Sequence, residues 1–95
     1  MNILHMKYAV EVARLGSLNK AAETLIIAQP NISRSIKELE ADLGITIFQR
    51  SAKGMVLTPD GEEFMDYARD ILHRIDKIEQ SYRDGSHKKR KFSIS

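Results

Sequence analysis

The stretch that decides the fold is residues 28–44, AQPNISRSIKELEADLG. We predict a helix here that begins near Pro30, where a missing backbone N–H costs nothing. It ends at Gly44, because glycine tolerates the left-handed dihedral angles of a helix C-terminus. The apolar residues of the stretch, at steps of four, three and four, are Ile32, Ile36, Leu39 and Leu43. This spacing places them in one narrow stripe, so the helix is expected to be buried on one side.

The other side of this helix carries small, polar and basic residues. At about 100° per residue, the side chains opposite the apolar stripe are Pro30, Ser33, Arg34 and Lys37, with Gln29 just before them. The face offers two cations, a hydroxyl and an amide, and such groups suit the major groove of DNA. An ordinary solvated face is the alternative, since charged outer faces are normal for amphipathic helices. The neighbouring segments decide between the two interpretations.

A short helix is predicted at the start of the chain. Residues 2–15 have apolar side chains at helical spacing, and Gly16 ends the helix. These apolar positions are Met6, Ala9, Val10 and Ala13. We expect the core of the unit to draw on Met6, Val10, Leu25, Ile32, Ile36 and Leu39.

A second short helix and a tight turn follow. Ser17 or Asn19 can cap a helix that runs from about residue 18 to residue 26. Its Ala21-Ala22 pair is small enough for the next helix to cross closely. Residues 26–29 form too short a turn for antiparallel packing, so we expect a steep helix-turn-helix crossing.

Two β-favouring segments come next, over residues 45–50 and 55–58. They flank residues 51–54, so we predict a hairpin. Because the hairpin follows directly on a helix suited to DNA, we interpret it as a wing to which Arg50 and Lys53 contribute two cations. A connecting hairpin with ordinary surface charges is the alternative.

The longest element is predicted to run to about Arg83. Thr58 can cap it, and Pro59 suits its first position. About 25 residues at 1.5 Å each give roughly 37 Å. The residues at heptad spacing, here named the seam, are Phe64, Ala68, Ile71, Ile75, Ile78 and Tyr82. Packing of the seam onto its own domain is the alternative, and we expect it for the first turn or two, through Phe64. One small domain cannot cover the remainder, so we expect a homodimer or higher homo-oligomer.

Composition excludes several classes of protein. Ninety-five residues with 42% hydrophobic content make one small domain. The absence of cysteine excludes disulfides and thiolate metal sites and fits a cytoplasmic protein. No run of about 18 apolar residues and no signal-peptide pattern occurs, so no membrane partner is expected. The formal charge is +2, and without the four cations of residues 88–91 it is −2. Net charge is therefore no argument for nucleic acid.

A catalytic or metal site is not expected. His5, His73 and His87 are scattered along the chain, and none has a carboxylate or histidine partner at metal-ligand spacing. The acidic residues of the last helix are explained by the helix dipole and by solvation. We therefore predict that the chain is not an enzyme and holds no cofactor.

The end of the chain indicates a further domain. Residues 86–91 contain a basic run, interpreted as a solvated hinge, with a non-specific phosphate contact as the alternative. Residues 92–95 alternate apolar and polar side chains, like the first strand of another unit. The predicted architecture is mainly α with a small β-hairpin. It comprises a winged helix-turn-helix over 1–58 and a linker or dimerisation helix over 59–84. Residues 85–95 are predicted to be a hinge and the start of a C-terminal domain of which the rest is absent.

The order of these residues resembles a known family. The matching positions are Gly16-Ser17-Leu18, Ala21-Ala22, Leu25, Gln29-Pro30, Ser33-Arg34, Ile36, Leu39-Glu40, Leu43-Gly44, Phe48, Arg50, Leu57-Thr58 and Gly61. They are similar to the N-terminal winged helix-turn-helix of LysR-type transcriptional regulators, over residues 1 to about 84. The resemblance implies a bacterial regulator that binds double-stranded DNA as a dimer through its linker helix. It also implies a missing C-terminal domain that senses a small-molecule effector.

The resemblance further implies which residues contact DNA. Family contacts carry over to Gln29, Pro30, Ser33, Arg34, Arg50 and Lys53. By their chemistry, Gln29 suits adenine, Arg34 suits guanine or a phosphate, and Pro30 suits a thymine methyl group. Ser33 suits a base edge or a phosphate, and Lys37 a backbone contact that sets register. Arg50 and Lys53 suit phosphate or a narrow minor groove, and Lys20 is a further phosphate candidate.

Two positions depart from the family pattern. Ala28 stands where the family usually has serine, so the hydroxyl that would cap the helix or contact phosphate is absent. Asn31 stands where a small apolar residue is common. Its amide could read adenine beside Gln29 or bind the DNA backbone.

A protein–protein interaction module is the competing interpretation. In it, the winged fold binds protein and the seam assembles subunits. Interaction winged helices often lack the cations that Arg34, Lys37 and Arg50 provide here. Retention on a heparin or DNA column, and its loss with salt, would distinguish the two.

Overall fold

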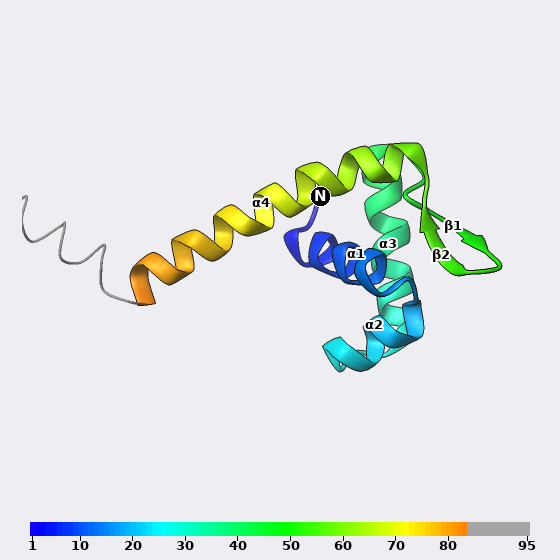
Figure 1. Ribbon diagram of the computed structural model, residues 1–95, viewed down its shortest axis with the longest axis horizontal. Coiled ribbons are helices and arrows are strands. Elements are labelled where there is room, and N and C mark those ends of the chain that lie inside the picture. The colour runs from blue at the N-terminus through cyan, green and yellow to red at the C-terminus, as the bar shows by residue number, and fades with distance from the viewer. Residues whose placement is uncertain (84–95) are drawn as a thin grey trace, which may run out of the picture.

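The computed structural model describes residues 1–83, so the predictions for the hinge, the basic run and the following strand lie outside the described residues. The elements, in chain order, are α1 (Ile3–Leu15), α2 (Leu18–Leu25), α3 (Gln29–Leu43), β1 (Phe48–Ser51), β2 (Gly54–Leu57) and α4 (Pro59–Arg83). Figure 1 shows α1 to α3 and the hairpin gathered into one head, from which α4 extends to one side. The fold class is the predicted one, a helix-turn-helix with a two-stranded wing and a long last helix.

The helix ends follow the predicted capping residues. Gly16 and Gly44 both take left-handed conformations, with φ of 67° and 69°, where α1 and α3 end. Ser17 is the cap of α2, since its hydroxyl accepts a hydrogen bond from the Lys20 N–H at 3.2 Å. The alternative prediction, that Asn19 caps α2, is wrong because Asn19 lies inside the helix. No side chain caps α3 at Ala28, as the departure from serine predicts.

The turn between α2 and α3 contains a conformation that the sequence analysis missed. Ile26, predicted to be the last residue of α2, instead follows the helix with a φ of +57°. A β-branched residue rarely adopts this left-handed conformation, because its Cβ crowds the following carbonyl oxygen. The Ile26 side chain is also 90% exposed, so no packing energy compensates for the backbone strain.

The core lies where the three head helices meet the start of α4. Met6, Ile32, Ile36 and Leu39 are buried as predicted, but Val10 and Leu25 are only half-buried. Val12, which was not predicted, is completely buried. The reason is that α1 contacts α2, α3 and α4 together, so its buried face is wider than a single helical stripe. Ala21 is also fully buried, as the predicted close helix crossing requires.

The hairpin is shorter than predicted at its first strand. β1 begins at Phe48 and pairs antiparallel with β2, and Ser51 lies opposite Gly54. Residues 45–47 are not strand, because the Glu40 carboxylate on α3 accepts hydrogen bonds from the N–H groups of Ile47 (2.7 Å) and Phe48 (3.4 Å). The Ile47 N–H is therefore engaged by a side chain of α3, directly before the first of the four residue pairs of the hairpin.

Gly16 and Gly54 allow the wing to lie close to the turn between α1 and α2. The Met55 N–H donates a hydrogen bond to the Gly16 carbonyl oxygen at 3.1 Å. A Cβ atom on Gly54 would lie 2.6 Å from that same oxygen, and the φ of Gly54 is +108°. A larger residue at position 54 would therefore push the wing away from the head.

The start of α4 belongs to the head. Thr58 caps the helix, with its hydroxyl oxygen accepting from the Gly61 N–H at 2.9 Å. Phe64 and Ala68, the first two seam residues, are buried in the chain's own core, so own-domain packing extends one step beyond Phe64. Further along the seam, Ile75 is half-buried, while Ile71, Ile78 and Tyr82 are 37%, 58% and 54% exposed. The surface left for a partner is this distal part of the seam.

Candidate nucleic-acid interface

The outer face of α3 gathers most of the predicted site residues. One shallow hollow of about 510 Å³ is lined by Gln29, Pro30, Ser33, Arg34, Lys37, Glu38 and Ala41. Pro30, Arg34 and Lys37 are exposed, while Gln29 and Ser33 are half-buried. The helical spacing that predicted a shared face for these residues is confirmed, since all five line the same depression.

A second hollow joins this face to the wing. It has a volume of about 240 Å³, and its polar lining includes Ser33 and Lys37 from α3 with Gln49 and Arg50 from β1. The side chains of Arg50 and Gln49 are exposed. The wing cation therefore shares a surface with the polar face of α3, as the interpretation of the hairpin as a wing requires.

A third hollow brings in the start of α2. Its volume is about 250 Å³, and it is lined by Gln29, Arg50, Ser17, Asn19 and Ser51, together with glycine and apolar residues. Gln29 and Arg50 thus each border two of the three hollows. Gln29 occupies the point where the face of α3, the wing and the first turn of α2 meet.

Sequence reasoning missed three polar residues of this surface, namely Asn19, Gln49 and Ser51. Asn19 was considered only as a cap, although a residue in the first turn of a short helix also faces outward. Gln49 and Ser51 lie next to Arg50 on a two-stranded sheet, and both are exposed. Their position beside a predicted wing cation was a signal that could have found them.

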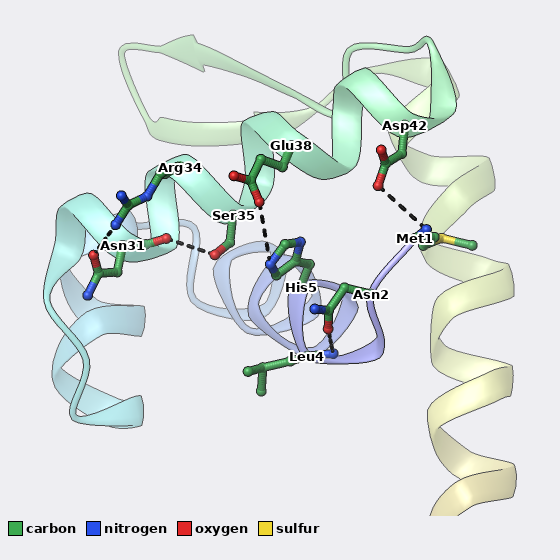
Figure 2. A network of polar contacts seen from close by, with 9 residues as sticks. All are labelled: Met1, Asn2, Leu4, His5, Asn31, Arg34, Ser35, Glu38 and Asp42. Atoms are coloured by element: carbon green, nitrogen blue, oxygen red, sulfur yellow. Dashed lines mark hydrogen bonds and ion pairs between the residues drawn. The ribbon is translucent and has the colours of Figure 1, made fainter.

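The remaining predicted residues lie around these hollows. Lys53 is exposed in the two-residue turn at the wing tip, and its N–H donates to the Ser51 hydroxyl at 3.1 Å. Lys20 is exposed in the first turn of α2. Asn31 is exposed on α3 and accepts a hydrogen bond from the Arg34 guanidinium (Figure 2).

The acidic residues of α3 are engaged with other parts of the head. Figure 2 shows Glu38 against His5 of α1, with 3.8 Å between Oε2 and Nε2, and Asp42 against the Met1 amino group at 3.5 Å. Glu40 accepts the two backbone N–H groups that precede and begin the wing. Glu40 and Asp42 are thereby directed to the wing and to the N-terminus. Glu38 reaches His5 but stays exposed at the edge of the hollow that Arg34 and Lys37 line.

Residues 1–83 show neither the side-chain arrangement of a metal site nor a helix that could span a membrane. No group of three or more His, Cys, Asp or Glu side chains in this range is arranged to hold a metal ion. Within the same range, no helix has the length and hydropathy needed to cross a membrane.

The three head helices, the wing and the polar face shared by α3 and β1 define a winged helix-turn-helix protein. A family model confirms the class and refines it. The model for bacterial regulatory helix-turn-helix proteins of the lysR family matches residues 3–62, and the chain belongs to this family.

Characterised and uncharacterised regulators are among its relatives. The uncharacterised HTH-type transcriptional regulator YcgK of Bacillus subtilis is 50% identical over 78 residues, which cover 82% of this chain and 24% of that protein. The HTH-type transcriptional regulator BenM of Acinetobacter baylyi is 40% identical over 78 residues, covering 82% of this chain and 26% of that protein. The chain therefore spans about a quarter of the length of these relatives.

Solved structures of the same family superpose on most of the chain. The BenM DBD in complex with catB site 1 DNA matches with a TM-score of 0.81 and 37% identity, covering 92% of this chain and 97% of that chain. The CbnR DBD–DNA complex matches with a TM-score of 0.80 and 36% identity, covering 90% of this chain and 99% of that chain.

Proposed function

We propose that this chain is the DNA-binding part of a bacterial transcription regulator, and that it binds double-stranded DNA sequence-specifically. The observation that carries the proposal is the continuous polar and basic surface formed by α3, β1 and the start of α2. Gln29 and Arg50 each border two of its hollows. The similar DBD structures that are complexed with DNA support this assignment.

The residues divide into base readers and backbone anchors by their chemistry. We assign base reading to Gln29 and Arg34, whose amide and guanidinium groups suit bidentate contacts with adenine and guanine. Pro30 and Ser33 would complete the surface in the major groove. Lys37, Arg50, Lys53 and Lys20 would contact phosphate, because a flexible cation binds a charge without identifying a base.

The functional unit is proposed to be a homodimer that binds two half-sites. The distal seam exposes Ile71 and Ile78 on a helix that extends away from the head (Figure 1). Pairing with the α4 of a second copy would bury these side chains and join two DNA-binding heads. A two-fold axis then relates the two half-sites.

The proposal also covers four properties of the whole protein. The chain would act by binding and not by catalysis, it would need no cofactor, and the protein would be cytoplasmic. A C-terminal domain would bind the small-molecule effector.

The test is a selection of bound sequences from a random pool of duplex DNA. We expect an enriched motif of two half-sites related by dyad symmetry, with affinity that falls steeply as salt rises. An Arg34→Ala variant should lose the preference at one base pair in each half-site, while Arg74→Ala, which removes an exposed cation from α4, should keep the whole motif. Failure of the wild-type chain to enrich any sequence would favour the protein–protein interaction module instead.

A further inference from the structure

Asn31 and Arg34 are linked on the outer face of α3. The Nη2 atom of Arg34 donates a hydrogen bond to Oδ1 of Asn31, three residues earlier on the helix (Figure 2). Both side chains are exposed. The carboxylate one turn further on, Glu38, faces His5 instead. The Arg34 guanidinium is therefore oriented by a neutral amide oxygen.

This contact changes what Asn31 can do at a base edge. Bidentate recognition of adenine requires an asparagine oxygen to accept from the N6 amino group while its NH₂ donates to N7. Here the asparagine oxygen already accepts a hydrogen bond from Arg34, so an adenine N6 amino group would have to share that oxygen with the guanidinium. The guanidinium, by contrast, has five N–H donors, and one hydrogen bond to Asn31 leaves enough of them for the O6 and N7 acceptors of guanine.

We propose that Asn31 is a positioning residue that holds Arg34 ready to recognise guanine, and that Asn31 is not itself the reader of adenine. The inference rests on the proposed function, because it concerns how the same surface selects a sequence. Its physical basis is conformational entropy. A free arginine side chain loses much rotamer freedom when it is ordered on DNA, and a restraint that exists before binding reduces that loss.

The contact has no role in holding the fold together. Asn31 lies in the first turn of α3, its side chain is exposed, and it is not one of the buried core residues. Its backbone carbonyl also accepts a hydrogen bond from the Ser35 hydroxyl at 2.9 Å, and this bond does not depend on the Asn31 side chain. Side-chain variants at position 31 should therefore melt at the wild-type temperature.

The test compares sequence selection by the wild-type chain, Asn31→Ala, Arg34→Ala and the double variant. Arg34→Ala should flatten the preference at one base pair in each half-site. Asn31→Ala should weaken the preference at that same base pair by about three- to tenfold. In the double variant, the loss of Asn31 should add nothing at that position, because its effect passes through Arg34.

Two further variants separate positioning from direct reading. Asn31→Asp keeps an oxygen for Arg34 but loses the NH₂ donor, so it should keep the guanine preference while binding all sequences more weakly. Ser35→Ala, which removes the other hydrogen bond to Asn31, should leave every preference unchanged.

The outcomes distinguish the inference from the proposed function. If Asn31→Ala flattens a different base pair, acts equally with and without Arg34, or is mimicked by Asn31→Asp, the positioning role is overturned. It is also overturned if Arg34→Ala flattens no position. If the wild-type chain enriches no motif at all, the proposed function itself fails, and the inference fails with it.

Discussion

The Glu40 carboxylate of α3 accepts a hydrogen bond from the backbone N–H of Ile47 at a distance of 2.7 Å. Ile47 is fully buried, and its own carbonyl oxygen accepts from the N–H of Thr58 at 3.0 Å. A residue of α3 is thereby connected through one backbone position to the base of the wing and to the cap of α4. The relative placement of α3 and Arg50 depends on this connection.

Loss of the Glu40 carboxylate should destabilise the fold and loosen the wing. Glu40→Ala leaves the N–H groups of Ile47 and Phe48 without this acceptor, at a cost of about 1–3 kcal/mol in the free energy of unfolding. Urea denaturation would measure that cost. Glu38→Ala, which removes a more exposed carboxylate from the same helix, should change stability by less than about 0.5 kcal/mol. Equal effects of the two variants would contradict the structural role of Glu40.

Gln29 and Lys37 should differ in the kind of DNA binding they support. Gln29→Ala should cost about 1–3 kcal/mol at one or two base pairs and flatten the preference there. Lys37→Ala should weaken binding to all sequences alike and lower the magnitude of the salt slope by roughly one unit. Sequence selection and salt titration measure these two effects. An altered motif in Lys37→Ala, with an unchanged motif in Gln29→Ala, would reverse the assignment of reader and anchor.

A charge at Ile75 should separate the proposed dimer. Two-fold symmetry introduces any substitution twice, so Ile75→Glu would bury two carboxylates or force the helices apart. We expect a folded monomer in sedimentation, because the head keeps its core. Binding to two half-sites should weaken by roughly 10²–10⁴, since the second contact is no longer intramolecular.

The matched control for Ile75 is Gln80→Glu, an equal change of charge at an exposed position of α4 outside the seam. It should sediment as a dimer and keep its affinity. A dimeric Ile75→Glu with unchanged binding to two half-sites would show that the distal seam packs within its own chain.

Relief of the strain at Ile26 should stabilise the protein. Ile26→Asn or Ile26→Gly suits the left-handed conformation better, by about 1 kcal/mol. For a domain of this size that corresponds to a rise in melting temperature of roughly 4–8 °C. Ile26→Ala is the control, because it removes the exposed apolar surface but keeps a Cβ atom, and it should leave the melting temperature nearly unchanged. A rise with Ile26→Ala alone would assign the effect to surface exposure and not to the backbone.

The helices and their ends could be predicted from the sequence because their signals are local. Gly16, Ser17, Gly44 and Thr58 each act on backbone groups within four residues of themselves, so the capping pattern is visible in the chain. The shared face of Gln29 to Lys37 follows from helical geometry alone. The wing could be predicted from the β propensity of its residues and from its position after α3.

Features that depend on contacts between elements could not be predicted in this way. Val12 is buried because α1 has neighbours on several sides. The spacing of apolar residues within α1 does not indicate these neighbours. The first strand begins only at Phe48, and the N–H group of the preceding Ile47 donates to the carboxylate of Glu40, seven residues earlier on α3. Ile26 carries no signal for a left-handed turn, since the residue type disfavours the conformation that the tertiary structure imposes.

The burial of Met65 and Ala68 has a mechanical consequence. At its start α4 packs against α1 and contacts β2, so the helix cannot turn about its long axis unless the head turns with it. In the proposed dimer, each head would therefore move as one rigid body with its own α4. A twist or bend applied to the far end of α4 would reach DNA as a change in the distance and angle between two α3 helices, without any rearrangement inside either head.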